Sequence, residues 1–318
     1  MKNLIFLLLI SIIISSCSPD NDSSIQNTAS LDFIEVMSFQ VDTLALDMTS
    51  NINANSYYIT YSGDSGLNEN VLKYNLTSMA QTDLVHPDIS ESRQIEVING
   101  NIYSISHNDV YRYDLNLNNL EEVNIGYSDW RDARATIYNN NILMTTFLYD
   151  GIRRFDTSTN DYVNPISSLP NQQGRLYWSD GEVYGNKLYV FGGGETIRQP
   201  WPNPDIVNSF SEITIYDFNT DSWSEENLPY VAYETFTALY NSSIIVTGNR
   251  NQDQTNSFIG QYDILTNTYS ELDTSLDLEN ITIRGITILN DEILFAYIDL
   301  VSPMPDLMTV KVVKASLL

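Results

Sequence analysis

The chain alternates short apolar runs with clusters of Asn, Asp and Gly, and one such unit recurs about six times. In each unit, one apolar run ends at a tight polar turn, and a second run rich in Ile, Leu, Tyr and Val follows. The second runs begin at Ser56, Asn101, Asn141, Lys187, Ser243 and Glu292. The turns before them include Asn99-Gly100, Asn139-Asn140, Gly185-Asn186 and Asn290-Asp291. Such residue pairs accept the positive φ angles of a two-residue hairpin, so the pattern predicts repeated antiparallel hairpins.

A second marker lies later in each unit, where an aromatic residue is followed seven positions on by a large apolar residue. The pairs are Tyr113/Leu120, Phe155/Tyr162, Tyr216/Trp223 and Tyr262/Tyr269. An Asp and a turn rich in Thr and Asn separate the two members. The first unit departs from this rule, because Tyr74 is followed by Gln81. The marker predicts a second hairpin in each unit, and therefore four strands per unit.

The unit resembles the kelch repeat, whose signature is a double glycine after the second strand, then a Tyr, then a Trp after six intervening residues. Residues 187–223 match it fully, with Gly192-Gly193, Tyr216 and Trp223. The fifth unit has a single Gly248, and the second, third and sixth lack the glycines. The resemblance implies an all-β fold, a six-bladed kelch-like β-propeller with four-stranded blades. It implies no particular activity, because propellers carry many functions.

The last unit contains only three strand-like segments, at about residues 281–289, 292–299 and 308–315. Residues 33–41, before the first unit, form a strand-like segment without a hairpin partner. A blade buries its faces only when it is stacked against neighbours around an axis. We therefore predict that residues 33–41 supply the outer strand of the last blade and that the ring is closed in this way.

The N-terminus has the pattern of an export signal. Lys2 precedes an apolar run over residues 4–14, which is too short to span a bilayer and typical of a signal peptide. The run ends in Ile14-Ser15-Ser16-Cys17, which resembles the bacterial lipobox, in which the cysteine receives the lipid. The alternative is an ordinary secretory signal with an incidental cysteine.

These features predict three parts: a lipoprotein signal peptide over residues 1–16, a lipidated Cys17 and flexible tether over 17–30, and the propeller over 31–318. The tether is polar and has no apolar periodicity. Its Asp20 and Asp22 resemble surface-export signals of outer-membrane lipoproteins, although a merely solvated tether is an equal alternative. We expect an outer-membrane lipoprotein, periplasmic or surface-exposed, and not a cytoplasmic protein.

Charge and residue usage exclude several classes of partner and chemistry. The chain has 41 acidic and 15 basic residues and a formal net charge of −26. This argues against binding to nucleic acid, and against membrane attachment other than through the lipid. With two His and one Cys, we expect no zinc or copper site and no cofactor, and we assign no metal ligands, although the Asp- and Asn-rich residues 63–70 leave calcium as an alternative without EF-hand spacing. Copper-radical oxidases that resemble galactose oxidase need a Tyr–Cys crosslink, so the use of Cys17 for lipidation leads us to reject that activity.

A binding site is expected on the face that carries the 2–3 loops and the connections between blades. The longest loop, residues 194–211, contains Trp201 among three prolines, which would present this side chain at its tip. The alternative is that Trp201 packs over the neighbouring blade. The candidate ligand-binding residues on this face are Arg93, Trp130, Arg134, Arg175, Trp178, Trp201, Tyr233 and Arg284.

Three of these arginines are expected where the inner strands begin. Arg93 and Arg284 lie eight residues before a second-run start, and Arg134 lies seven before. Guanidinium groups suit carboxylates and phosphates, and aromatic faces suit sugar rings, so the pattern favours capture of a saccharide. The alternative is structural: an arginine at this repeat position pairs with an acidic neighbour in the next blade.

The main functional hypothesis is a non-catalytic, membrane-anchored extracytoplasmic propeller that binds a glycan or a partner protein. One alternative is a carbohydrate-active enzyme of the sugar epimerase or lyase kind. Such an enzyme needs carboxyl groups as acid and base, and the chain has many of them; Glu182, Glu195 and Glu234 are candidates expected near the same face. The repeat style is similar to that of kelch-like sialic-acid epimerases, but no shared motif carries their active site to this chain. Another alternative is a scaffold subunit of an envelope complex.

Overall fold

The computed structural model describes residues 30–41, 46–62, 69–86, 92–106, 109–125, 134–145, 151–167, 178–197, 206–250, 256–300 and 307–317. These parts contain no helix that is long and apolar enough to cross a membrane. Cys17 and the proposed signal peptide lie outside them.

The described chain is all-β and is built from four-stranded antiparallel units, numbered here as sheets 1 to 6 along the chain. Sheet 1 contains β2 (Leu46–Asn51), β3 (Ser56–Ser62), β4 (Glu69–Asn75) and β5 (Gln81–His86). Sheet 2 contains β6 (Ser92–Ile98), β7 (Asn101–Ser106), β8 (Asp109–Asp114) and β9 (Glu121–Ile125). Sheet 3 contains β10 (Arg134–Tyr138), β11 (Asn141–Thr145), β12 (Gly151–Asp156) and β13 (Asp161–Ser167).

Sheets 4 and 5 are joined through one long strand. Sheet 4 contains β14 (Asp180–Tyr184), β15 (Lys187–Phe191), β17 (Ile206–Asp217) and the first part of β18 (Ser222–Tyr240). The second part of β18 begins sheet 5, which continues with β19 (Ser243–Asn249), β20 (Ser257–Asp263) and β21 (Thr268–Glu271). The sequence pattern predicted two separate units here and did not predict that their connection would be a continuous strand.

The last sheet combines the two ends of the described chain. Sheet 6 contains β22 (Ile281–Leu289), β23 (Glu292–Asp299) and β24 (Met308–Ser316), and β1 (Ile34–Val41) pairs antiparallel with β24 as its outer strand. The prediction that residues 33–41 join the last unit is therefore confirmed. Leu31 strengthens this junction, since it is buried and its backbone N–H donates to the carbonyl of Asp273.

The predicted hairpins are present at the predicted residues. All six second strands begin where the pattern placed them, at Ser56, Asn101, Asn141, Lys187, Ser243 and Glu292. The turns before them contain left-handed residues, with φ of +52° and +77° at Asn99 and Gly100 and of +52° and +60° at Asn290 and Asp291. Asn, Asp and Gly tolerate this conformation best, which is why they punctuate the sequence.

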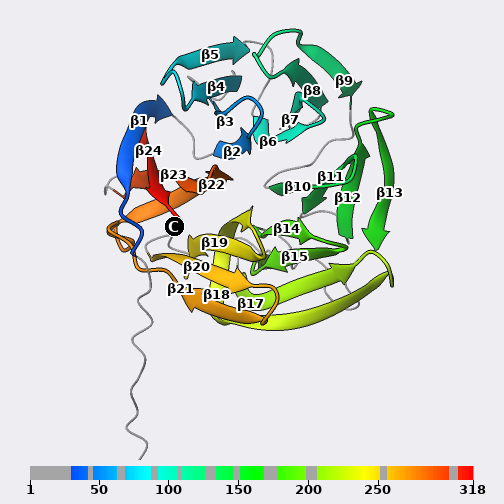
Figure 1. Ribbon diagram of the computed structural model, residues 1–318. Coiled ribbons are helices and arrows are strands. Elements are labelled where there is room, and N and C mark those ends of the chain that lie inside the picture. Colours follow the sequence, from blue (N-terminus) through cyan, green and yellow to red (C-terminus); the bar gives the residue numbers. More distant parts are fainter. Residues whose placement is uncertain are drawn as a thin grey trace, which may run out of the picture.

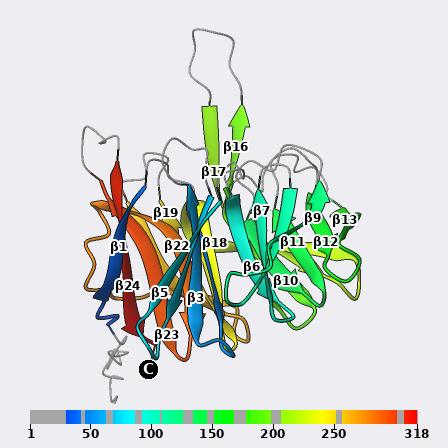
Figure 2. The same cartoon turned by 90° about the horizontal axis from the view of Figure 1, so that it is seen from above.

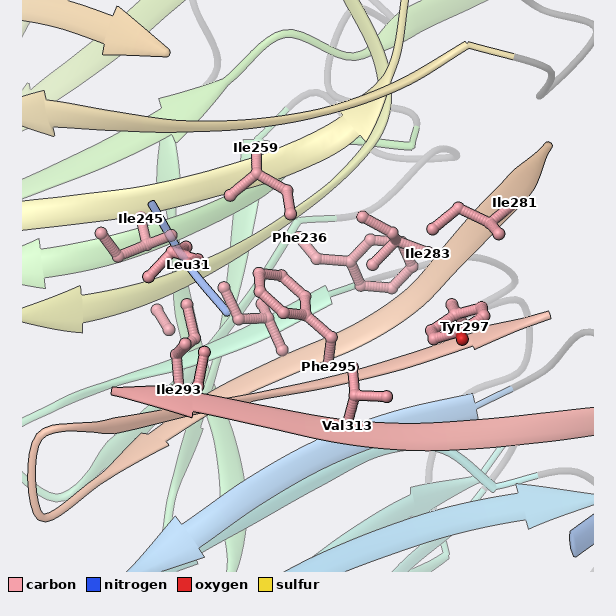
Figure 3. Packing of buried hydrophobic residues seen from close by; sticks show 13 residues of the cluster. Leu31, Phe236, Ile245, Ile259, Ile281, Ile283, Ile293, Phe295, Tyr297 and Val313 are labelled. Atoms are coloured by element: carbon pink, nitrogen blue, oxygen red, sulfur yellow. The ribbon is translucent and has the colours of Figure 1, made fainter. Parts of the chain in front are cut away.

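The sheets stand around a common centre, with β2, β6, β10, β14 and β22 innermost (Figure 1). Each innermost strand packs against the next, from β2 through β6, β10, β14, β18 and β22 and back to β2. One hydrophobic cluster fills each junction between neighbouring sheets. Figure 3 shows the junction of sheets 5 and 6, where Phe236, Ile245 and Ile259 meet Ile283 and Phe295. This arrangement is consistent with a β-propeller.

The double glycine at the end of β15 has a steric reason. Gly192 and Gly193 have φ of +57° and +103°, and a Cβ on Gly192 would lie 2.3 Å from the carbonyl oxygen of Ala232. The N–H groups of both glycines donate to carbonyls of neighbouring strands, at Glu212 and Ala232. The glycines thus let the chain turn sharply where β18 crosses closely, which a side chain would prevent.

The excursion predicted as a loop over residues 194–211 is largely a two-stranded ribbon. β16 (Gly194–Ile197) pairs with the first part of β17, from Gly194 opposite Ser209 to Ile197 opposite Ile206. The ribbon projects beyond the loops of the sheets (Figure 2). Trp201 lies outside the described residues, so the prediction that it is presented at the tip stays a prediction.

Candidate ligand cavity between the innermost strands

Strand register places two layers of side chains around the centre of the molecule. Each innermost strand contributes one residue to each layer. The residue two positions before the end of the strand belongs to the lower layer, and the residue four positions before the end belongs to the upper layer. The lower layer contains Thr49, Glu96, Thr136, Glu182, Ala238 and Thr287. The upper layer contains Asp47, Gln94, Arg134, Asp180, Phe236 and Gly285. Because side chains alternate along a strand, residues two apart share a face, so each strand contributes to both layers.

These layers enclose a cavity of about 230 Å³. All six lower-layer residues and four of the upper-layer residues line it, the exceptions being Gln94 and Gly285. With Thr237, which also lines the cavity, the wall combines four carboxyl groups, one guanidinium, four threonine hydroxyls and one aromatic ring. Its charged members are Asp47, Glu96, Arg134, Asp180 and Glu182.

Two upper-layer carboxylates cap exposed backbone groups of a neighbouring inner strand. The Ile95 N–H donates to Asp47 Oδ2 at 3.0 Å, and the Thr237 N–H donates to Asp180 Oδ2 at 2.7 Å. An innermost strand has one edge without a partner strand, so its N–H groups need other acceptors. The two aspartates occupy equivalent repeat positions and supply such acceptors to the next sheet. This gives them a structural role as well as a place in the cavity wall.

Removal from water raises the pKa of both aspartates. Burial brings the pKa of Asp47 to about 6 and that of Asp180 to about 7, although the positive charge of Arg134 and the backbone hydrogen bonds oppose the shift. The charge of Asp47 adds to the rise at Asp180. Both groups therefore change protonation between pH 5 and 8, far above the range of an ordinary aspartate.

The lower-layer glutamates are shifted further. Burial and then the charge of Asp180 raise the pKa of Glu182 to about 8, against a hydrogen bond of 3.1 Å donated by the Thr136 hydroxyl. Burial, followed by the charges of Asp47, Glu182 and Asp180, holds the pKa of Glu96 well above its usual range. Both glutamates therefore bind protons more readily than ordinary carboxyl groups, and a positively charged ligand next to them would favour their ionised form.

Arg134 reaches across the centre from sheet 3 to sheet 5. Its guanidinium carbon lies 4.3 Å from the centroid of the Phe236 ring, which is a cation–π contact. The same guanidinium lowers the pKa of both Asp47 and Asp180. Within the described lining, the cavity thus contains one cation, which contacts an aromatic face and whose charge acts on two nearby carboxyl groups.

Among the predicted site arginines with described side chains, Arg284 has a different role from Arg134. Arg284 forms an ion pair with Glu234, and the two side chains are 3% and 2% exposed. The Asn249 amide donates to the second oxygen of Glu234, and the Ser257 hydroxyl donates in turn to Asn249. This is the structural alternative left open for these arginines, and the burial leaves Arg284 no surface for a ligand.

The structure brings two further predicted residues together, one just before β14 and the other where the second part of β18 begins to pair with β19. Trp178 has a φ of +61°, and its ring centroid lies 5.9 Å from that of Tyr233. Tyr233 is only 8% exposed, and its ring also packs over Gly194. The adjacent Glu234 has a φ of +51°. The pair is therefore part of a tightly packed junction rather than an open aromatic platform.

The remaining predicted site residues lie outside the described part of the chain. Trp130, Arg175 and Trp201 fall there entirely, while Arg93 belongs to β6 and Glu195 to β16 without described side chains. Sequence reasoning named Arg134 and Glu182 but missed Asp47, Glu96, Asp180 and Phe236. Register could have found them, because they share repeat positions with Arg134 or Glu182.

Comparison with models of known protein families and with curated proteins found no match for this chain. Within the described segments, no group of three or more His, Cys, Asp or Glu side chains is arranged to hold a metal ion. What the cavity offers chemically is a set of proton-binding carboxyls, hydroxyls and one cation seated on an aromatic ring.

Proposed function

We propose that this chain is a six-bladed, kelch-like β-propeller, closed by its N-terminal strand and tethered to the outer membrane through a lipid on Cys17. We further propose that its central cavity binds a saccharide. The first part is supported by the succession of contacts between innermost strands and by the pairing of β1 with β24. The second part depends on the cavity.

The single observation that carries the binding function is the polar lining of this enclosed space. Carboxyl-bearing or threonine residues from all six sheets line a volume of about 230 Å³. Pockets for drug-sized ligands measure roughly 300–1,000 Å³, so this cavity suits a smaller ligand of about one sugar ring. Hydroxyl groups of a sugar both donate and accept hydrogen bonds, and they match a wall in which some carboxyls are protonated and others are not.

The charge of the cavity changes the expected kind of saccharide. Converging arginines favoured a sugar with a carboxylate, but the described cavity holds four carboxyl groups and one arginine. An acidic sugar would meet like charges, whereas a neutral or basic sugar would not. The proposal therefore favours sugars without an acid group.

A carbohydrate-active enzyme of the epimerase or lyase kind is the second candidate. It is favoured by the pKa values of about 7 for Asp180 and about 8 for Glu182, which suit proton transfer near neutral pH. Burial and neighbouring carboxyl charges produce these values without any catalytic role, so binding without turnover is the simpler function. Incubation of each bound sugar with the protein, followed by analysis of the products by NMR, separates the two.

Thermal denaturation of residues 18–318 with neutral, amino and acidic sugars tests the binding function. A ligand at 100 times its Kd stabilises the folded state by about 2.7 kcal/mol, which raises Tm measurably. We expect stabilisation by at least one neutral or amino sugar, and a smaller stabilisation in Glu182→Gln. The matched control is Glu122→Gln, on the exposed face of β9. Absence of any shift across the panel would contradict saccharide binding and direct the search to a partner protein.

A further inference from the structure

We propose that the central cavity selects ligands with a positively charged amino group, of which an amino sugar is the saccharide form. This inference rests on the proposed binding function and specifies the chemistry of its ligand. Three features of the cavity support it: the excess of carboxyl groups over cations, the Phe236 ring that contacts the Arg134 guanidinium, and the Thr237 hydroxyl without a hydrogen-bond partner.

The charged side chains in the cavity are unbalanced. Every inner strand from β2 to β14 contributes one or more of them, and together they comprise Asp47, Glu96, Asp180 and Glu182 against Arg134. Arg134 acts on the two aspartates of the upper layer. Arg134 is not among the causes that act on the lower-layer glutamates: burial and the charges of Asp47, Glu182 and Asp180 raise the pKa of Glu96, and burial and the charge of Asp180 raise that of Glu182. An added cation next to these glutamates would relieve that repulsion.

The cavity also contains a surface that accepts a cation. Phe236 presents its ring to the guanidinium of Arg134 at 4.3 Å, so the aromatic face and the carboxylates already act together on a positive group. An ammonium group that enters the cavity would meet the same combination. A carboxylate would find only Arg134, which already interacts with Asp47 and Asp180.

An unused polar group on the wall is independent of the carboxyl cluster. Thr237 lines the cavity and is 6% exposed, and its hydroxyl has no hydrogen-bond partner in the described structure. Its backbone N–H is occupied by Asp180. A buried hydroxyl without a partner is unfavourable, and a ligand that carries hydroxyl and amino groups together would satisfy it.

Binding of an amine should release protons. Near neutral pH the raised pKa values of Asp180 and Glu182, about 7 and about 8, keep these groups partly protonated, and burial and neighbouring charges raise the pKa of Glu96 as well. An ammonium group favours their ionised form, so part of the bound protons leave as the ligand enters. Affinity should therefore rise as the pH is raised from 5 to 7. The other titratable groups that face the site are Asp47 and Arg134.

The experiment is isothermal titration calorimetry of residues 18–318 with four sugars that share one ring: glucosamine, glucose, N-acetylglucosamine and glucuronate. Methylammonium is included as a cation without a sugar. At pH 6.5 we expect glucosamine to bind about tenfold more tightly than glucose, glucuronate to bind most weakly, and the heat to depend on the buffer because protons are released.

Each outcome decides one of the two proposals. Glucose that binds as tightly as glucosamine would overturn amine selectivity and retain saccharide binding. Methylammonium that binds while all four sugars fail would retain the cation site and overturn saccharide binding. Absence of binding by all five compounds would overturn both.

Two variants test whether the effect arises in this cavity. Glu182→Gln should reduce the preference for glucosamine over glucose to about threefold or less, while Glu122→Gln should keep it unchanged. Arg134→Met removes the internal cation and should strengthen binding of glucosamine and methylammonium. Circular dichroism and Tm without ligand verify that each variant folds, and an unaltered preference in folded Glu182→Gln would overturn the assignment.

Discussion

Arg134 and Arg284 both lie in innermost strands, β10 and β22, but have opposite surroundings. Arg284 is buried against Glu234, whose other carboxylate oxygen accepts a hydrogen bond from Asn249. Arg134 lies in a cavity with four carboxyl groups, and its charge acts on two of them, Asp47 and Asp180. The arrangement around Arg284 is typical of a structural ion pair. The arrangement around Arg134 is typical of a binding site, because the carboxyl groups outnumber the cation. An arginine at this repeat position is therefore identified as structural or functional by its surroundings and not by its residue type.

The two arginines differ in surroundings because β22 contains one extra residue in its pairing with β23, whereas β10 pairs regularly with β11. Arg134 is paired regularly, opposite Thr145, whereas the pairing of β22 with β23 shifts between Ile283 and Gly285. Arg284 is the extra residue at this bulge. A bulge redirects the side chain that it contains. Arg93 lies at a similar shift, between Ser92 and Gln94. A count of eight rather than seven residues before the second strand therefore marks a bulge.

The largest expected effect is on the buried pair. Removal of one partner, in Arg284→Met, leaves the Glu234 carboxylate buried without its cation and should lower the free energy of unfolding by about 3–5 kcal/mol. Urea denaturation at pH 7 measures this. Lys311→Met, which breaks a half-exposed ion pair with Asp299, is the control and should change stability by less than about 1 kcal/mol. A loss below that level in Arg284→Met would contradict a structural role for Arg284.

The corresponding change in the cavity, Arg134→Met, should have a smaller and pH-dependent effect. The charge of Arg134 lowers the pKa of Asp47 and Asp180, so its removal makes their ionisation less favourable. We expect a loss of about 1–2 kcal/mol at pH 8 and much less at pH 5, where these groups are protonated. Urea denaturation at both pH values measures the difference. If Arg134→Met lost the same free energy of unfolding at both pH values, Arg134 would act as a structural residue like Arg284.

The cavity carboxyls should also make the wild-type protein less stable as the pH rises. In the folded protein the pKa is about 6 for Asp47 and about 7 for Asp180, against an ordinary value of 3.8, and about 8 for Glu182, against 4.5. Between the ordinary and the raised value of each group, the folded protein binds more protons than the unfolded chain. The free energy of unfolding then falls as protons leave. Tm should decrease from pH 5 to pH 8, and the slope should be smaller in Glu182→Gln than in Glu122→Gln. A flat profile would contradict the raised values.

The smallest expected effect concerns the hydroxyl of Thr237. In Thr237→Val the shape is nearly kept and a buried polar group without a partner is lost, so stability should change by less than about 1 kcal/mol, in either direction. If this hydroxyl contacts the ligand, the same variant should weaken sugar binding. Thermal denaturation with and without the sugar measures both quantities, and unchanged binding would exclude Thr237 from the site.

Local sequence was sufficient to predict the hairpins. The Asn, Asp and Gly residues at the turns require positive φ, and the apolar runs have the length and alternation of strands, so each second strand began at its predicted residue. The outer position of residues 33–41 also followed, because three strands in the last unit leave one edge without a partner. The continuous β18 could not be predicted from its turn signals, since the packing of sheets 4 and 5 determines whether their connection is extended.

The sequence by itself therefore determined the repeat, the strands and the exchange of a strand between the two ends, because these depend on turn chemistry and short-range alternation. Tertiary structure decided which polar side chains meet. Asp47, Glu96, Asp180 and Glu182 come from three separate repeats, and their proximity depends on how the sheets are arranged around the centre. Burial then raised their pKa values, and bulges at single residues decided which arginine joined them. Both effects come from contacts distant in the chain, which local patterns do not encode.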